Sequence, residues 1–296
     1  MNKRATEVRK PYEELEFRDN FMFGRVMQDK ELCREVLECL LQQPVGELSE
    51  PVSEKEVRHT SDGKYIRFDI YTRDEETVYD AEMQNLNNKS VDSLELPRRT
   101  RYYQAVIDTD HLNKGGNYRF LPDSAILYIC TFDPFGRNLS KYTFVGACRE
   151  DRDLTINDGA VRIFYNCTYK GDDISDELRK LYDYVENGVV GNELTKHIDG
   201  AVKKARKVEG WRSEYMFYDI NLMDAKYEGQ VEGLEQGREE GRKEERAKTE
   251  AERRRADAEQ KRADAAEAQV KELKALLAND ALEELAKYKE KYGEIV

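Results

Sequence analysis

The sequence predicts an α/β protein, with a mixed sheet flanked by helices and a carboxy-terminal helical coiled-coil tail. β-rich runs alternate with helical patterns through the first 224 residues. One strand is almost continuously apolar and follows a predicted helix, which is typical of a parallel crossover. Prolines and aromatic residues nearly vanish after Tyr227, and Glu, Lys, Arg and Ala take over. We therefore expect a domain over residues 1–224 and a charged tail over residues 225–296.

The amino-terminal part of the domain predicts two helical pieces and three strands. Apolar residues recur at helical spacing over residues 20–43, and Asp29 stands where a cap would begin the second piece. Three β-rich runs follow at residues 54–61, 64–72 and 76–84, separated by turn-forming residues. We expect these runs to form a meander.

The second half of the domain predicts a crossover and further strands. Residues 96–115 run from a proline suited to a first helical turn to a glycine pair suited to a stop, so we expect a helix. The apolar run 124–132 then has the composition of a strand buried on both faces. Strands are also expected at residues 141–148 and 160–168, and helix from 174 to 219.

The tail predicts a short coiled-coil seam. Alanine, valine and leucine fall on heptad-like spacings at Ala256, Ala263, Ala266, Val270, Leu273 and Leu277. Such a seam could join copies of the chain into a homo-oligomer, and the alternative is a solvated single helix. Four glycines recur at every fourth residue before the seam, which suits either a glycine stripe or a weakly helical linker. Residues 278–293 are expected to form a separately capped helix.

Charge and composition exclude several classes of protein. The net charge is -12, and residues 226–296 hold 16 Lys and Arg against 19 Asp and Glu, so the body of the chain is acidic. An acidic body argues against a constitutive electrostatic grip on nucleic acid, although local basic patches remain open. No run of about 18 apolar residues and no apolar signal core occurs, so we expect a cytoplasmic protein without a membrane partner. An odd set of cysteines without a CxxC pair disfavours disulfide frameworks and zinc sites.

Strand alternation predicts a pair of carboxylates on neighbouring strands. In the run 64–72, Asp69 lies opposite the apolar face, which comprises Ile66, Phe68 and Ile70. In the run 76–84, the face that holds Glu82 also holds Val78, Asp80 and Gln84. Converging carboxylates suit Mg²⁺ (or Mn²⁺), because such ions take one or two protein carboxylates plus water and phosphate oxygens. The alternative is that these acids face solvent and discourage edge pairing.

Several separated motifs stand in order over roughly residues 17–245 of the chain. They are DNFMFGRVMQDKELC, IRFDIYT, VYDAEMQN, LPRRTRYYQAVIDTDHLNKGGNY, ILYICTFDPFG, DGAVRIFYN and EYMFYDINLMDAKYEGQVEG. This series resembles the Rpn family of recombination-promoting nucleases, often labelled transposases, within the PD-(D/E)XK nuclease superfamily. The resemblance implies a restriction-endonuclease-like core and metal-dependent DNA cleavage by acidic residues from adjacent strands.

The resemblance also assigns roles to individual residues. Asp69 matches the first acidic position and Glu82 the second, and Gln84 stands where the superfamily has a lysine. We expect Asp69 and Glu82 to hold Mg²⁺ (or Mn²⁺), with the main-chain carbonyl of Met83 as an extra ligand and Gln84 orienting the attacking water. Because Gln84 carries no charge, the metal must then do more of the catalytic work.

Two further groups are candidates for the site. Asp19 resembles an acidic position that family members carry near the amino terminus, and is either an additional acidic site residue or the cap of the first helix. The predicted crossover helix begins with a basic and aromatic group suited to the DNA backbone: Arg98, Arg99, Arg101, Tyr102 and Tyr103. The alternative is that the tyrosines pack on the sheet and the arginines pair with nearby acids.

These observations predict a Mg²⁺-dependent DNA endonuclease linked to DNA recombination or a mobile element. The alternative from another class is a catalytically silent nuclease-like fold that serves as a binding or oligomerisation module. RNA also remains open as the substrate, since metal chemistry on phosphodiesters does not need the 2′-hydroxyl.

Overall fold

The computed structural model describes residues 10–57, 66–85, 95–112 and 115–292, so parts of two predicted strands, residues 58–61 and 64–65, lie outside it. The chain divides into two units between Tyr218 and Asp219. The sequence suggested a boundary near 224. The boundary defined by packing therefore comes before the boundary defined by composition. The last helix begins at Glu209 inside the first unit, and Tyr215 of that helix is still buried.

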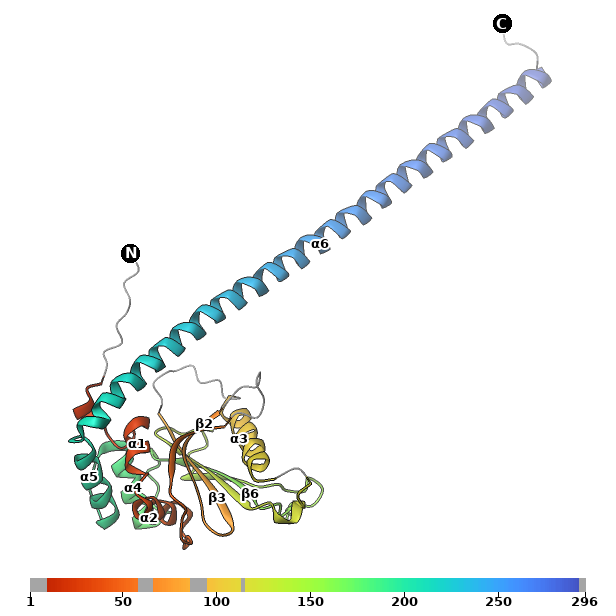
Figure 1. The fold of residues 1–296 in the computed structure, drawn as a ribbon. Coiled ribbons are helices and arrows are strands. Elements are labelled where there is room, and N and C mark those ends of the chain that lie inside the picture. Colours follow the sequence, from red (N-terminus) through yellow and green to blue (C-terminus); the bar gives the residue numbers. More distant parts are fainter. Residues whose placement is uncertain (1–9, 58–65, 86–94, 113–114, 293–296) are drawn as a thin grey trace. The chain divides into compact units, whose positions relative to one another are not determined.

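Within the described residues, a six-stranded mixed sheet in the order β1-β2-β3-β4-β6-β5 forms the centre of the first unit (Figure 1). Its first three strands are β1 (Val52–Val57), β2 (Ile66–Arg73) and β3 (Thr77–Gln84). Both neighbouring pairs among them are antiparallel, which confirms the predicted meander.

The crossover predicted after the meander is confirmed. Helix α3 (Glu95–His111) leads from β3 to β4 (Asp123–Cys130), and these two strands are parallel. β6 (Ala160–Asn166) adds a second parallel pairing, and β5 (Lys141–Phe144) lies antiparallel to β6 at the edge. A short 3₁₀ helix, Tyr118–Phe120, precedes β4.

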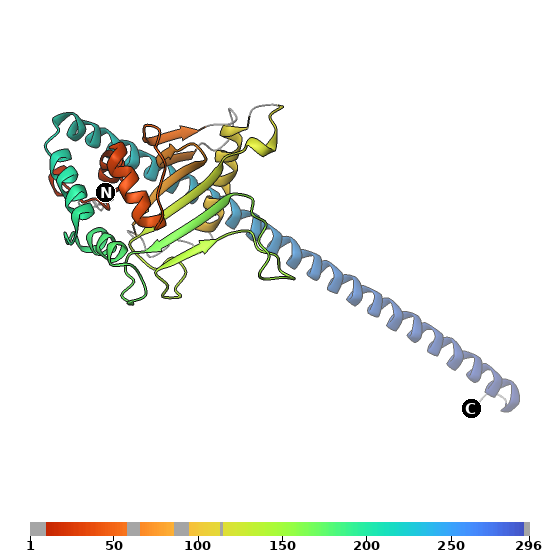
Figure 2. The same cartoon turned by 90° about the horizontal axis from the view of Figure 1, so that it is seen from below.

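The two faces of the sheet are covered differently (Figures 1 and 2). Four helices pack on the face opposite α3. They are α1 (Asn20–Val26), α2 (Lys30–Leu41), α4 (Asp176–Asn187) and α5 (Glu193–Ala205), preceded by the 3₁₀ helix Tyr12–Glu14. Asp29 caps α2 as predicted, because its side chain accepts a hydrogen bond from the Leu32 N–H at 3.1 Å. The mixed sheet flanked by helices therefore confirms the predicted α/β class, and the restriction-endonuclease-like core stays a prediction.

The tail is described by helix α6 (Glu209–Tyr292), which runs without a break for 84 residues. The separately capped helix expected over residues 278–293 is therefore wrong, since Asn279 and Asp280 lie inside α6 and cap nothing. The four glycines of the repeat are helical, and a Cβ added at any of them would meet nothing within 4 Å. The tail thus offers a helix compatible with a coiled coil.

None of the helices in the described part of the chain combines the length and the apolar character that crossing a membrane would require.

Candidate functional site

The predicted carboxylate pair lies where the ladder between β2 and β3 ends. The last paired positions are Ile70 and Ala81, so Asp69 and Glu82 are the next positions in register. Here side chains replace the main-chain bonds: the Asp69 N–H donates to Glu82 Oε1, and the Met83 N–H donates to Asp69 Oδ2, each at 3.0 Å. Each carboxylate thus accepts from the backbone of the other strand, which holds the two acidic side chains against each other.

The alternation of β2 changes phase at this point. Phe68 packs in the apolar cluster beneath α3, whereas Ile70 packs in the cluster on the opposite face. The prediction that Ile70 shares the face of Ile66 and Phe68 is therefore wrong. A strand keeps strict alternation only while its main chain stays in the ladder, and the ladder ends beside Asp69.

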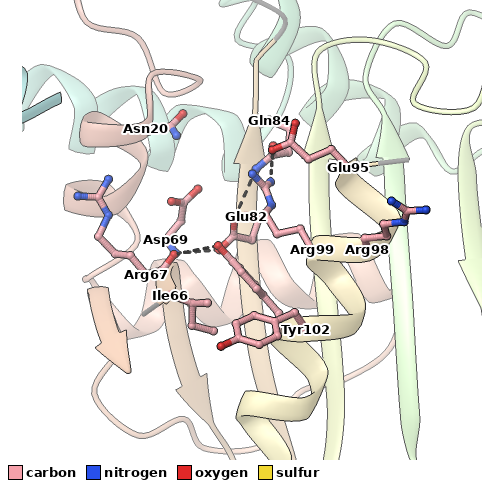
Figure 3. Close-up of a pocket in the computed structure, with 11 residues that line it drawn as sticks. Asn20, Ile66, Arg67, Asp69, Glu82, Gln84, Glu95, Arg98, Arg99 and Tyr102 are labelled. Atoms are coloured by element: carbon pink, nitrogen blue, oxygen red, sulfur yellow. Dashed lines mark hydrogen bonds between the residues drawn. The ribbon is translucent and has the colours of Figure 1, made fainter. Parts of the chain in front are cut away.

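The acidic pair opens into a cavity of about 930 Å³ (Figure 3). Residues of β2, β3, α3 and the first residue of α1 form its wall. The predicted site residues in this wall are Asp69, Glu82, Gln84, Arg98, Arg99, Tyr102 and Tyr103. Asn20, Arg67 and Glu95 add polar groups that the sequence had not assigned to a site. The fold therefore brings the acidic pair and most of the basic and aromatic group together.

Gln84 connects the acidic pair to α3. Its Nε2 donates to Glu82 Oε2 at 3.4 Å, and its Oε1 accepts from Arg99 Nη2 at 2.7 Å (Figure 3). Both ends of the amide are engaged, which fixes its orientation. These two hydrogen bonds connect Glu82 and Gln84 of β3 to Arg99 near the start of α3.

Three carboxyl groups crowd this region and have raised pKa values. Burial raises the pKa of Asp69, and the neighbouring Glu82 charge raises it further. Burial also raises the pKa of Glu82, against the opposing effect of Arg99. Asp80, which is 0% exposed, has a raised pKa because of burial and then because of Glu82 and Asp69. Neither Asp80 oxygen accepts a hydrogen bond from a described residue, so this carboxyl is stable only while it keeps its proton.

The donor set suits a hard divalent cation. Asp69 and Glu82 each use one carboxylate oxygen for a main-chain N–H; the second oxygen of Asp69 is Oδ1, and that of Glu82 is Oε2, which has the long 3.4 Å contact from Gln84. Mg²⁺ commonly binds through one or two protein carboxylates and keeps several waters. No cluster of three or more His, Cys, Asp and Glu side chains suited to a metal occurs among the described residues, so the protein ligands would be this pair. Met83 enters the site through its N–H, and the role expected for its carbonyl stays a prediction.

The basic and aromatic residues of α3 comprise three exposed side chains, one buried tyrosine and one arginine that bonds Gln84. Arg98 is exposed and Tyr102 is 43% exposed at the cavity wall, whereas exposed Arg101 is not part of that wall. Tyr103 is buried, and its hydroxyl donates to the Arg67 carbonyl at 3.3 Å, so the packing alternative describes this residue. Arg99 points toward Gln84. Within the described residues, no carboxylate lies within 4.0 Å of the three α3 arginines, so the alternative in which these arginines pair with nearby acids is not seen.

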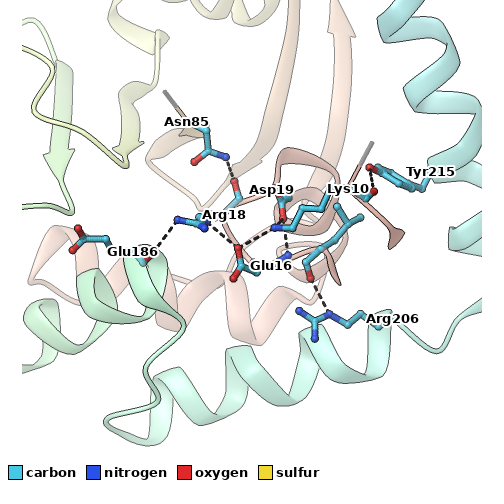
Figure 4. Close-up of polar contacts among 9 residues, drawn as sticks. Lys10, Glu16, Arg18, Asp19, Asn85, Glu186, Arg206 and Tyr215 are labelled. Carbon is cyan, nitrogen blue, oxygen red and sulfur yellow. Dashed lines mark hydrogen bonds and ion pairs between the residues drawn. The ribbon is translucent and has the colours of Figure 1, made fainter. Parts of the chain in front are cut away.

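Asp19 lies outside the cavity wall and belongs to a separate polar network (Figure 4). It stands at the cap position of α1 but makes no side-chain cap bond. Its Oδ2 accepts instead from Lys10 Nζ at 2.5 Å and from the Glu16 N–H at 2.7 Å. In the same network the Arg18 carbonyl accepts from the Asn85 side chain just after β3. Asp19 therefore helps to fix the segment that brings its neighbour Asn20 to the cavity.

Strand alternation places Asp80 on the correct face, but Asp80 was not among the predicted site residues. The available signal was an acidic residue inside a strand with apolar neighbours on both sides, which is rare unless the group is paired or functional. Asn20 and Glu95 gave no such signal. They reach the cavity only through the placement of α1 and α3.

Comparisons of the chain with protein-family models, with curated proteins and with solved structures found no match in any of the three.

Proposed function

We propose that this protein is a Mg²⁺- or Mn²⁺-dependent DNA endonuclease with a restriction-endonuclease-like core. The observation that supports this most is the pairing of Asp69 with Glu82 where two antiparallel strands part, at the wall of a cavity that also holds arginines. Two carboxylates pressed together and partly buried carry an electrostatic penalty that a divalent cation relieves. The meander followed by a parallel crossover accords with the core expected from the resemblance.

The residues of the cavity have distinct tasks in this proposal. A bound divalent ion would lower the pKa of a water and offset charge on the phosphate. Asp69 and Glu82 hold that ion, and their hydrogen bonds to the opposite backbone fix the distance between them. Arg98 and Tyr102 lie on the outer wall, where they can contact the backbone of the bound strand. Gln84 maintains the orientation of Glu82.

A second proposal concerns the tail as a self-association element. Val270, Leu273 and Leu277 are each more than half exposed on α6. A helix of this length with an unpaired apolar seam is stabilised when a second helix covers the seam. We infer that two copies of the chain associate through α6, which would hold two nuclease sites at high effective concentration.

The nuclease proposal is tested with supercoiled plasmid in Mg²⁺, Mn²⁺ or EDTA. Asp69→Asn and Glu82→Gln keep side-chain volume but remove one ligand charge each, so each should reduce metal-dependent nicking by at least about 10³-fold. Glu56→Gln on β1 is the matched control, because Glu56 is exposed and lies outside the cavity wall. Nicking by Asp69→Asn at the wild-type rate would show that the assigned site is wrong. A parallel reaction on single-stranded RNA decides between the two substrates.

Metal binding can also be measured without activity. Mn²⁺ that binds the folded state raises the melting temperature by mass action. We expect this increase for the wild type and for Glu56→Gln, and its loss in Asp69→Asn. If Mn²⁺ does not change the melting temperature of the folded wild type, the catalytically silent alternative is favoured.

A further inference from the structure

The site contains a cation next to Gln84, the residue that stands where the resembled superfamily has a lysine. Arg99 Nη2 donates to Gln84 Oε1 at 2.7 Å, and Gln84 Nε2 reaches Glu82 Oε2 at 3.4 Å. The guanidinium comes from α3, whereas Gln84 and Glu82 are on β3. Figure 3 shows the three side chains in sequence along the wall of the cavity.

The charge of Arg99 has no direct counter-ion among the described residues. No carboxylate there lies within 4.0 Å of its nitrogens, in contrast to Arg67, whose Nη1 is 3.5 Å from Glu54 Oε1. The Nε of Arg99 is buried and has no hydrogen-bond partner within the part of the chain that the structure describes. The Tyr103 and Tyr128 rings flank the guanidinium, each with its centroid 5.8 Å from Cζ. Arg99 is therefore held in place with N–H donors to spare.

A fixed guanidinium with spare donors suits a phosphate. Its planar N–H groups match the oxygens of a phosphodiester and form charge-assisted hydrogen bonds. The opposite charges in the cavity are also arranged for such a ligand, because the acidic pair would face a metal ion and Arg99 would face the phosphate. The Gln84 amide separates the two groups and binds both.

We propose that Arg99 supplies the positive charge that Gln84 lacks, and that Gln84 is a positioning residue that connects Arg99 to Glu82. This inference rests on the proposed nuclease function. As water attacks, a new P–O bond forms, the bond from phosphorus to the leaving ester oxygen breaks, and charge grows on the non-bridging oxygens. Arg99 donates N–H groups to one of those oxygens. The attacking water releases its proton to solvent, and the leaving oxygen takes a proton from solvent.

The test removes the positive charge at position 99 and restores one at position 84. Removing a donor to such a transition state typically lowers the rate by about 10²–10³-fold, which we expect for Arg99→Met. Arg99→Lys keeps the charge but loses the planar fork, so it should lose less, about tenfold. Adding Gln84→Lys to Arg99→Met restores a cation and should recover at least about tenfold. Arg34→Met on α2 is the charge control, because Arg34 pairs with Glu31 and Glu38 away from the cavity.

Mn²⁺ affinity, measured by calorimetry, gives a second result that does not depend on cleavage. Removing a cation beside the acidic pair should tighten Mn²⁺ binding about threefold or more in Arg99→Met, and Gln84→Lys should weaken it. Gln84→Lys with Arg99 intact tests this even if Arg99→Met unfolds. A wild type that never nicks DNA while Mn²⁺ affinity still follows these charges rejects the nuclease but retains the charge assignment.

Two results would overturn the role of Arg99. One is an Arg99→Met variant with unchanged nicking and unchanged Mn²⁺ affinity. The other is a loss of nicking that Gln84→Lys does not recover, with Mn²⁺ affinity unchanged, which is the result expected of a purely structural arginine.

Discussion

On the sheet face covered by α1, α2, α4 and α5, buried tyrosine hydroxyls donate to main-chain carbonyls, whereas on the α3 face several buried polar atoms have no such partner. Tyr165 donates to the Leu40 carbonyl at 3.0 Å and Tyr182 to the Ser140 carbonyl at 2.8 Å. Beneath α3, the Tyr128 hydroxyl, Arg99 Nε and both Asp80 oxygens are buried without a hydrogen-bond partner among the described residues. The hydroxyls of Tyr165 and Tyr182 are thus satisfied on one face, whereas the other leaves several buried groups unsatisfied beside the cavity.

The largest effect on stability is expected on the four-helix face. Leu37 of α2 is fully buried in that cluster, so Leu37→Ala should lower the free energy of unfolding by about 2–5 kcal/mol through lost burial and a cavity. Urea denaturation measures the change. The nicking rate per folded molecule should stay at the wild-type value. A loss below about 1 kcal/mol would show that this face does not anchor the fold.

A change of opposite sign is expected at Asp80. Asp80→Asn removes a buried carboxyl that the folded protein must keep protonated against its ordinary pKa, so it should raise the free energy of unfolding at neutral pH by about 1–3 kcal/mol. The pH dependence follows from the raised pKa. Above the ordinary value near 3.8 the unfolded chain releases this proton while the folded chain keeps it, so wild-type stability falls as pH rises.

The gain from Asp80→Asn should therefore grow between about pH 4 and pH 7, and denaturation curves at both values measure it. The stability of the variant should still fall somewhat as pH rises, because the pKa values of Asp69 and Glu82 are raised too. A destabilised variant at pH 7 would mean that the Asp80 carboxylate has a favourable partner in the folded protein.

Two tyrosine-to-phenylalanine substitutions, one on each face of the sheet, compare the stabilising effect of a buried hydroxyl on the two faces. Tyr165→Phe removes a hydroxyl that donates to the Leu40 carbonyl and should cost about 1 kcal/mol of stability. Tyr128→Phe removes a buried hydroxyl that has no hydrogen-bond partner in the described ranges, so its cost should be close to zero or negative. The difference between the two melting temperatures is the measurement. Equal losses would contradict the contrast between the faces.

The smallest effect on the domain is expected from removing the tail. A chain that ends at Asp224 should unfold with nearly the same midpoint, because Tyr215 is the last residue of the four-helix-face cluster among the side chains that the structure describes. Light scattering should show full-length dimers and truncated monomers. Full-length protein that stays monomeric at tens of micromolar would contradict association through α6. Loss of double-strand cuts with retained nicks in the truncated form would support it.

The elements of this chain follow from local patterns, and the sequence predicts them well. The meander, the parallel crossover after residues 96–115 and the cap at Asp29 are all confirmed, because periodicity and capping residues act over a few positions. The proximity of Asp69 and Glu82 was also accessible, since a short turn between adjacent strands sets the register. Continuous helix across Asn279 and Asp280 was missed because capping residues signal a helix start even where the helix simply continues.

Tertiary structure decided what surrounds the acidic pair. Alternation alone could not show that the ladder stops at Ile70, because that depends on side chains of Asp69 and Glu82 taking over bonds from the backbone. Nor could it show that Arg99, rather than Arg98 or Arg101, reaches Gln84, since the rotation of α3 over the sheet is set by packing of Tyr103 and its neighbours. Sequence therefore determined the elements and the acidic pair, and packing between distant elements determined which cation, amide and buried carboxyl lie beside that pair.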